Sequence, residues 1–285
     1  MSGGGSRRIE VGEAGSRVGL NVEVHGSGVP LLALHGFMGS AATWTPFAES
    51  WQEVQLVAVD LLGHGGSDAP VDAGRYRVER TVEDLVAVLD RLSLAPVVVL
   101  GYSMGGRVAM RLALHLAERA PDRLRGLILE SASAGIADAG ERAARVASDR
   151  ALADRIERDG IEAFVREWES LPMWASQSGL SEAARSGLRA QRLGQLAVGL
   201  ANSLRGMGAG VETPVLDDLS RLPTATLVVC GTMDAKYRAV GAAMGERIRA
   251  SRVEIVEGCG HAVHLEAPDR FASLVGEFVA SLPSN

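Results

Sequence analysis

Several features are scarce in this chain of 285 residues, and each scarcity excludes a class of protein. No apolar run approaches the roughly 20 residues that a membrane-spanning helix needs, so no membrane insertion is expected. The Gly/Ser-rich segment from Met1 to Arg8 lacks the apolar core of a secretory signal. The only cysteines, Cys230 and Cys259, are too few for a disulfide framework, and both follow apolar runs typical of buried positions. We expect a soluble cytoplasmic protein.

Positive charge is also in short supply. The chain has 29 basic and 35 acidic residues, which gives a formal net charge of -6 at pH 7. Because phosphate binding requires a basic face, nucleic acid is not an expected partner. Lys236 is the only lysine, so arginine carries nearly all the positive charge. A compositional bias of the genome explains this most simply, but the planar fork of arginine is also well suited to binding carboxylates.

Apolar patterning predicts strands that alternate with helices. Strands are predicted over 17–25, 29–34, 54–59, 95–100, 124–129, 227–230 and 253–256, and helices over 76–92, 104–120 and 271–282. This alternation indicates an α/β fold with a mostly parallel, doubly wound sheet. It is interrupted by a helical segment rich in Arg, Ala and Glu, which we interpret as a lid over the carboxyl edge of the sheet. We expect a core of residues 1–133 and 223–285, and a helical lid of residues 134–222.

The strongest motif lies between a buried strand and a helix. Gly101-Tyr102-Ser103-Met104-Gly105 fits the pattern G-x-S-x-G, and its strand-turn-helix setting is the one that a nucleophile elbow requires. Glycines are needed there because the strained turn leaves no room for side chains. Ser103 is therefore the candidate nucleophile, and the alternative is a serine that only caps the helix.

Two later loops supply the partners that such a serine needs. Asp234 follows the strand before last and His261 follows the last strand, which gives the chain order Ser, acid, His of this fold. The carboxylate would orient the imidazole, and the imidazole would take the serine proton. Two alternatives are that Asp234 is a surface acid and that His264 replaces His261. His261 and His264 form H-x-x-H, but no third ligand has a suitable spacing, so no metal site is predicted.

Two backbone donors for a developing negative charge are expected near Ser103. In this fold, one N–H comes from the residue after the nucleophile and another from the loop after an earlier strand. These residues are Met104 and Phe37. His35, just before that loop, is interpreted as a structural histidine of the turn.

Several runs closely resemble the menaquinone-pathway family of 2-succinyl-6-hydroxy-2,4-cyclohexadiene-1-carboxylate synthases. They are Leu34–Ser40, Val59–Gly65, Gly101–Arg107, Leu129–Ser133, Glu141–Arg145, Asn202–Gly208 and Gly260–His264. The likeness extends over about Leu31 to Ala267, and the Gly101–Arg107 run and the lid runs are its most specific parts. The resemblance implies an α/β-hydrolase fold with a helical lid inserted after the sixth strand.

The resemblance also implies a reaction that is not hydrolysis. This family eliminates pyruvate from a cyclohexene that carries a succinyl arm, a ring carboxylate and an enolpyruvyl ether, without a metal or an organic cofactor. The triad would be Ser103, Asp234 and His261, acting as a base without an acyl-enzyme. The substrate contacts implied by the resemblance are Tyr102, Arg107, Arg145, Trp168 and Arg189. A small polycarboxylate is thus the expected partner, and the sequence carries no prediction of oligomeric state.

Two other functions are compatible with the same residues. An ordinary serine hydrolase of esters or carbon–carbon bonds would employ the same triad with Ser103 as a true nucleophile. A binding protein that kept the fold without catalysis is the second alternative, and an intact triad argues against it. The density of arginine favours a polyanionic substrate over an apolar ester.

Overall fold

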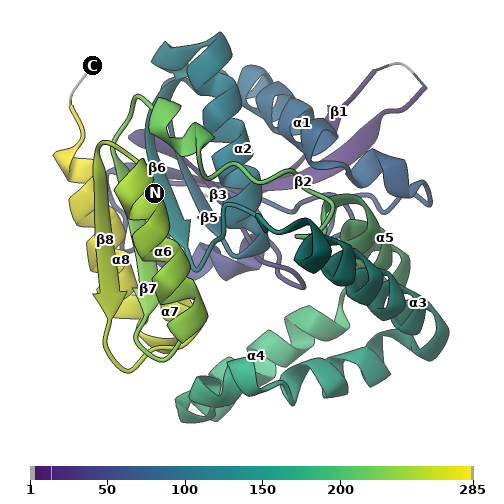
Figure 1. Ribbon diagram of the computed structural model, residues 1–285. Helices are drawn as coiled ribbons and strands as arrows, with labels where there is room; N and C mark the ends of the chain where they lie inside the picture. Colours follow the sequence, from purple (N-terminus) through teal and green to yellow (C-terminus); the bar gives the residue numbers. More distant parts are fainter. Residues whose placement is uncertain (1–3, 14, 284–285) are drawn as a thin grey trace.

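The computed structural model describes residues 4–13 and 15–283, and its centre is an eight-stranded sheet (Figure 1). The strands are β1 (Gly5–Val11), β2 (Val18–His25), β3 (Val29–Leu34), β4 (Val54–Val59), β5 (Val97–Tyr102), β6 (Leu124–Glu130), β7 (Thr226–Gly231) and β8 (Ser251–Val256). Their spatial order is β1-β2-β4-β3-β5-β6-β7-β8, antiparallel at β1–β2 and β2–β4 and parallel from β4 to β8. The parallel strands bring their carboxyl ends to one edge, where ligands bind in sheets of this class.

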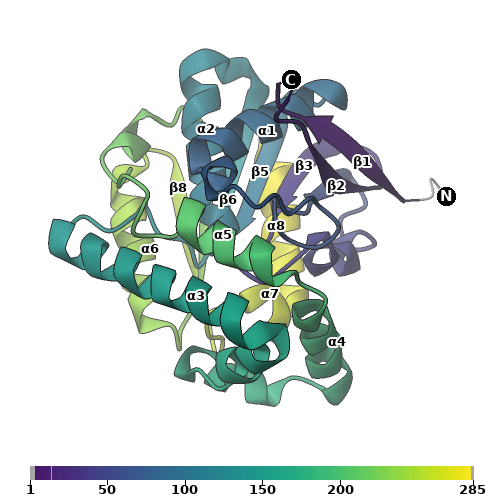
Figure 2. The same cartoon turned by 90° about the vertical axis from the view of Figure 1, so that its right-hand side faces the viewer.

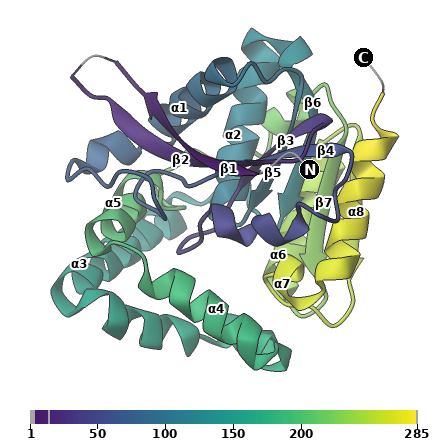
Figure 3. The same ribbon diagram turned by 180° about the vertical axis from the view of Figure 1, so that it is seen from behind.

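Helices cover both faces of the sheet, because the central strands are apolar on both sides. The helices are α1 (Val78–Arg91), α2 (Met104–Arg119), α3 (Ala139–Glu169), α4 (Glu182–Leu193), α5 (Ala197–Met207), α6 (Ala235–Arg247), the single turn α7 (Val263–Glu266) and α8 (Pro268–Ser281). One core packs α1, α2 and α6 against one face. A second core packs α8 against the opposite face. Figure 3, which is turned by 180° from Figure 1, shows α8 on the near side. All six residues of β5 and of β7 are buried between these layers.

The α/β fold predicted from the patterning is confirmed, but the strand β1 was not predicted. Only Ile9 and Val11 of its seven residues are buried, because β1 is an edge strand that pairs with β2 through its backbone. Its sequence therefore lacks the apolar run that identified the central strands. Within the described residues, no helix has both the length and the apolarity to cross a membrane.

Helices α3, α4 and α5, with the 3-10 helix η5 (Pro172–Gly179), form a layer below the carboxyl edge of the sheet (Figures 1 and 2). They lie between β6 and β7 in the chain, and α3 bends at Gly160, where the backbone has φ 81°. A third apolar cluster joins Phe164, Val165 and Leu200 of this layer to Met38 of the core. This is the segment expected to form the lid, and its exact limits, 134–222, stay a prediction.

The lid and the core also meet backbone to backbone. Gly199 of α5 lies against Gly63 in the loop after β4, so closely that a Cβ on Gly199 would overlap the Gly63 carbonyl oxygen. Gly63 itself has φ +81°, a conformation that other residues adopt at a cost. A glycine on each side is thus what allows this close approach.

We expect Gly199→Ala to destabilise the protein by about 1–3 kcal/mol, because the added methyl group must push the lid away from the core. Gly276→Ala in α8 is the matched control, since a Cβ there meets nothing within 4 Å. Replacing a helical glycine with alanine in open space stabilises by up to about 1 kcal/mol. Urea unfolding of both variants checks this, and equal changes in the two would contradict it.

Candidate active site

Ser103 occupies a strained turn between β5 and α2. Its backbone has φ 51° and ψ -108°, a region that residues other than glycine rarely adopt. Neighbouring glycines make the turn possible: a Cβ on Gly105 would overlap the carbonyl groups of Leu34 and His35. Ser103 stands at the N-cap position of α2, yet its side chain makes no capping hydrogen bond. The hydroxyl is therefore directed elsewhere, and the alternative of a simple helix cap does not describe it.

The three candidate triad residues meet at the carboxyl edge of the sheet. His261 Nε2 lies 3.0 Å from Ser103 Oγ, and His261 Nδ1 lies 2.6 Å from Asp234 Oδ2. With Nδ1–H donating to the carboxylate, Nε2 is left free to accept the serine proton. Asp234 is held as the N-cap of α6, where its Oδ1 accepts the N–H of Tyr237 at 3.2 Å. His261 is 3% exposed, so the pair is shielded from water.

His264, the alternative base, is engaged in a different pair. Its Nδ1 lies 2.9 Å from both carboxylate oxygens of Glu130 at the end of β6, and both side chains are buried. Glu130 Oε1 also accepts the backbone N–H of His264 at 2.9 Å. The geometry thus puts His261, and not His264, beside Ser103.

The two predicted oxyanion donors lie next to the nucleophile. Phe37 and Met104 line the same cavity as Ser103. Met104 is the first residue of α2, where N–H groups have no intrahelical partner. Gly36 lets the Phe37 loop approach, because a Cβ on Gly36 would overlap the ring of Tyr102. Both N–H groups could therefore stabilise charge that develops beside Ser103.

Two buried histidines support this loop. His35 Nδ1 donates to the Gly36 carbonyl at 2.7 Å, and its Nε2 accepts the N–H of Leu61 at 3.0 Å, an arrangement that only the neutral ring can make. The ring of His64 lies 5.0 Å from that of His35. Burial lowers the pKa of His35 to about 4 and that of His64 to about 3, and the nearby His35 ring adds to the effect on His64. His35 is thus built into the turn, as its sequence position indicated.

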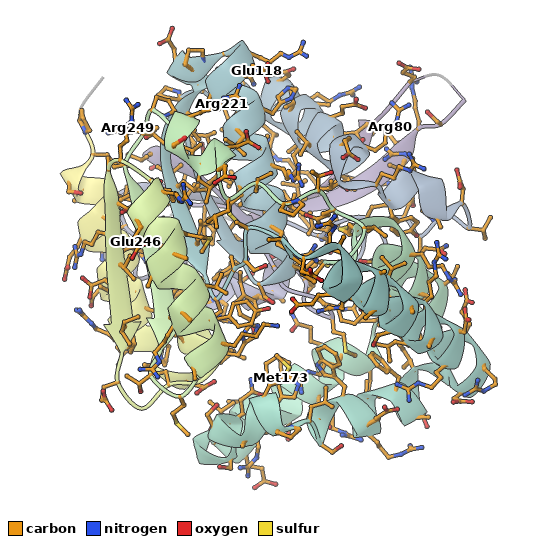
Figure 4. The ribbon with its side chains drawn as sticks, in the orientation of Figure 1. Arg80, Glu118, Met173, Arg221, Glu246 and Arg249 are labelled. Atoms are coloured by element: carbon orange, nitrogen blue, oxygen red, sulfur yellow. The ribbon has the colours of Figure 1, made fainter. Side chains whose placement is uncertain are left out.

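A cavity of about 430 Å³ opens from the triad toward the lid. Core and lid residues both line it, among them Tyr102, Ser103, Arg107, Arg145, Leu152, Trp168, Met173, Trp174, Met207, Lys236, Tyr237 and His261. Figure 4 labels Met173 on the lid, below the core in that view. Most of the predicted site residues therefore share one enclosed space.

The predicted arginines divide into two groups. Arg107 and Arg145 line the cavity, and each also pairs with an acid: Arg107 with Glu212, and Arg145 with Asp149 at 2.8 Å. Arg189 does not line it. It pairs with Glu169 and borders a neighbouring hollow of about 520 Å³ between η5 and α4. The geometry thus supports two of the three expected arginine contacts, and the role of Arg189 stays a prediction.

Aromatic rings connect the lid to the base. Ring centroids are 5.5 Å apart for Phe37 and Trp168, 5.6 Å for Trp168 and Trp174, and 5.7 Å for Trp174 and His261. The ring centroid of Tyr237 also lies 4.5 Å from that of His261. Trp174 and Tyr237 were not singled out from the sequence. Tyr237 follows Asp234 by three residues, which is a usable signal, whereas nothing in the local pattern around Trp174 reveals its contact.

A further arginine that sequence reasoning missed is Arg192. It is 6% exposed, its guanidinium lies 5.5 Å from the ring centroid of Trp174, and it pairs with Glu169 at 3.2 Å. Burial lowers its pKa. The other two arginines of α4, Arg185 and Arg189, are exposed, so the burial of Arg192 could not be recognised without the packing of the lid.

A serine on a strand-to-helix turn, with the acid and the histidine following in that chain order, is the arrangement of the α/β hydrolases. Residues 31–274 match the model of the alpha/beta hydrolase family. The chain is 41% identical over 252 residues to a Bacillus subtilis (strain 168) protein provisionally named 2-succinyl-6-hydroxy-2,4-cyclohexadiene-1-carboxylate synthase, covering 88% of this chain and 90% of that protein. It is 30% identical to the synthase of that name from Serratia proteamaculans (strain 568), over 88% of this chain and 93% of that one.

A solved structure agrees with these relatives. MenH from S. aureus superposes with a TM-score of 0.84 and 28% identity, covering 98% of both chains. This chain belongs to the alpha/beta hydrolase family and, within it, to the family of the 2-succinyl-6-hydroxy-2,4-cyclohexadiene-1-carboxylate synthases.

The buried histidines predict an acid-dependent loss of stability. Because their folded pKa values lie below the unfolded value near 6.5, their contribution is complete above pH 6.5 and is lost as pH falls toward 4. Each of the two histidines would lower the free energy of unfolding by about 2 kcal/mol between pH 7 and pH 5. Urea unfolding measures the free energy of unfolding at pH 7 and at pH 5. The decrease between the two pH values should be smaller for His64→Gln than for the wild type. The half-buried His115→Gln serves as control, and an undiminished pH dependence in His64→Gln would refute the assignment.

Proposed function

We propose that this protein eliminates pyruvate from 2-succinyl-5-enolpyruvyl-6-hydroxy-3-cyclohexene-1-carboxylate and so forms 2-succinyl-6-hydroxy-2,4-cyclohexadiene-1-carboxylate for menaquinone biosynthesis. The observation that carries the proposal is the Ser103–His261–Asp234 relay opening into a cavity that two arginines line. The names of the relatives give the product, and the elimination of pyruvate is what the resemblance to that family implies. A small polycarboxylate in the cytoplasm is the proposed substrate, and the reaction needs no metal or organic cofactor.

A comparison of the substrate ring with the product ring identifies the bonds that change. The substrate has one ring double bond at C3, and the product has two, at C2 and C4, and lacks the C5 substituent. A proton therefore leaves C2, the double bonds shift, and the C5–O bond breaks to release pyruvate as its enolate. The released enolate takes up a proton to become pyruvate, which balances the reaction.

In this proposal, Ser103 acts as the base and makes no acyl-enzyme. Ser103 Oγ passes its proton to His261 Nε2 and takes the proton from C2, while Asp234 stabilises the charged imidazole. The succinyl carbonyl is attached at C2, so negative charge develops on its oxygen. The N–H groups of Phe37 and Met104 are the proposed donors to that oxygen.

The substrate carboxylates are assigned to the arginines of the cavity. Arg107 lies one helical turn after Ser103, and Arg145 enters from α3 of the lid. A guanidinium binds a carboxylate through two parallel hydrogen bonds, which fixes the ring as well as attracting it. Tyr102 and Trp168, which also line the cavity, are proposed to contact the ring and its arms.

The first test is the serine. We expect Ser103→Ala to abolish pyruvate release from the enolpyruvyl substrate, generated in situ and corrected for its spontaneous decay. Ser133→Ala is the matched control, because Ser133 lines the cavity without a hydrogen bond to His261. Full turnover by Ser103→Ala would refute the mechanism. Slow pyruvate release by the wild type, together with rapid Ser103-dependent cleavage of p-nitrophenyl esters, would identify a serine hydrolase instead.

The second test separates the two groups of arginines. Arg145→Gln should raise KM about tenfold or more, because a charged hydrogen bond to a carboxylate is worth about 1.5–3 kcal/mol. Arg189→Gln should leave KM within about twofold, since Arg189 borders the separate hollow. Steady-state kinetics of both variants measure the difference, and an equal rise in KM would instead support the substrate contact of Arg189 that the resemblance implies.

A further inference from the structure

The guanidinium of Arg107 is shared between the cavity and a buried acid. Its Nη1 donates to Glu212 and to the Met207 carbonyl, the latter at 2.9 Å. The side chains of Arg107 and Glu212 are 11% and 5% exposed. Glu212 also borders an outer groove of about 660 Å³, so the ion pair forms part of the wall between that groove and the substrate cavity.

We propose that Glu212 is a positioning residue that holds Arg107 toward the substrate and limits the affinity of the cavity for carboxylates. The proposal rests on the proposed function, because it concerns the carboxylate that Arg107 would bind. Glu212 does not line the cavity with Ser103, and its action is through Arg107.

Two physical effects give Glu212 this role. Arginine cannot lose its proton, so a buried guanidinium needs a compensating charge at all times. With Glu212 on one side of Arg107, the site is ordered before the substrate arrives, which favours the reacting geometry. The same negative charge weakens the attraction of Arg107 for a second carboxylate, and a product with two carboxylates is then released more easily.

A purely structural role for Glu212 makes a different prediction. Arg111, one turn further along α2, donates to the Thr213 carbonyl, and its Nε lies 4.0 Å from Glu212 Oε2. Arg107 and Arg111 together therefore fasten the segment that follows α5 to the nucleophile helix. If fastening were the whole function, losing Glu212 or Arg111 would have similar effects. Arg111 does not line the cavity, which makes it the matched control.

The experiment measures binding of 2-succinylbenzoate, an aromatic dicarboxylate that lacks the enolpyruvyl group, by calorimetry. Glu212→Gln keeps the shape of the side chain and removes its charge. The Kd of this variant for 2-succinylbenzoate should therefore be about fivefold to tenfold lower than that of the wild type, and should depend more steeply on salt concentration. Its kcat for pyruvate release should also fall about tenfold, because Arg107 is less well held. Arg111→Gln should leave Kd within about twofold even if it lowers the melting temperature.

Glu212→Asp covers the case in which Glu212→Gln does not fold. Aspartate keeps the charge but shortens the side chain by one methylene, so Kd should stay within about twofold while kcat/KM falls about tenfold. Weaker binding in Glu212→Gln, equal behaviour of Glu212→Gln and Arg111→Gln, or an unchanged kcat/KM in Glu212→Asp would each overturn the proposal. The calorimetry needs no turnover, so a wild type that releases no pyruvate would refute the proposed function and leave the Glu212 proposal to be decided by binding.

Discussion

The hydrogen bond between Asp234 and His261 is the interaction on which the rest of the site depends. It joins the loops after β7 and β8 and determines which imidazole nitrogen faces Ser103. The close approach of these loops relies on Gly231, where a Cβ would overlap the carbonyl groups of Cys259 and Gly260. A side chain at that position would push the histidine loop away from β7. The order of parallel strands therefore supplies the three residues, and one glycine lets two of them meet.

Charge compensation is the second constraint on the cavity. Each of the two arginines that line it has an acidic partner, Glu212 for Arg107 and Asp149 for Arg145. The Arg107 side chain is only 11% exposed, and a buried charge without a partner would destabilise the fold by several kcal/mol, so Glu212 is required even before a ligand binds. The Arg145 side chain is 42% exposed, so solvent also compensates its charge. The arrangement supplies hydrogen-bond donors in fixed directions while keeping the local net charge low. This suits the proposed function, in which the product still carries the carboxylates that the arginines would bind.

The core of the site could be predicted from sequence because each of its signals is local. The Gly101–Gly105 motif lies where a strand is followed directly by a helix in the sequence. Asp234 and His261 each follow a strand in the order that the fold requires. The residues of the lid that face the cavity could not be predicted from local sequence. Its helices are rich in arginine on several faces, and their rotation is determined by contacts such as those of Phe164 and Leu200 with Met38. Arg189 and Arg192 lie three residues apart on α4, yet only the second is buried, beside Trp174. Glu212 lies in an irregular segment, where no periodicity indicates what it contacts.

The lid covers the imidazole that the proposed mechanism uses as the base. Trp174 of η5 and Tyr237 of α6 pack against the imidazole of His261, which is itself 3% exposed. In such a buried environment, the hydrogen bonds to Ser103 and Asp234 are stronger than they would be in bulk water, since burial limits competition from solvent. A serine has little basicity of its own, so in the proposed mechanism the relay depends on this shielding to move a proton from carbon. The aromatic contacts that join η5 to Phe37 therefore place one lid segment over both the cavity and the imidazole. In the proposed mechanism, the segment that covers the substrate is thus also the one that shields the base.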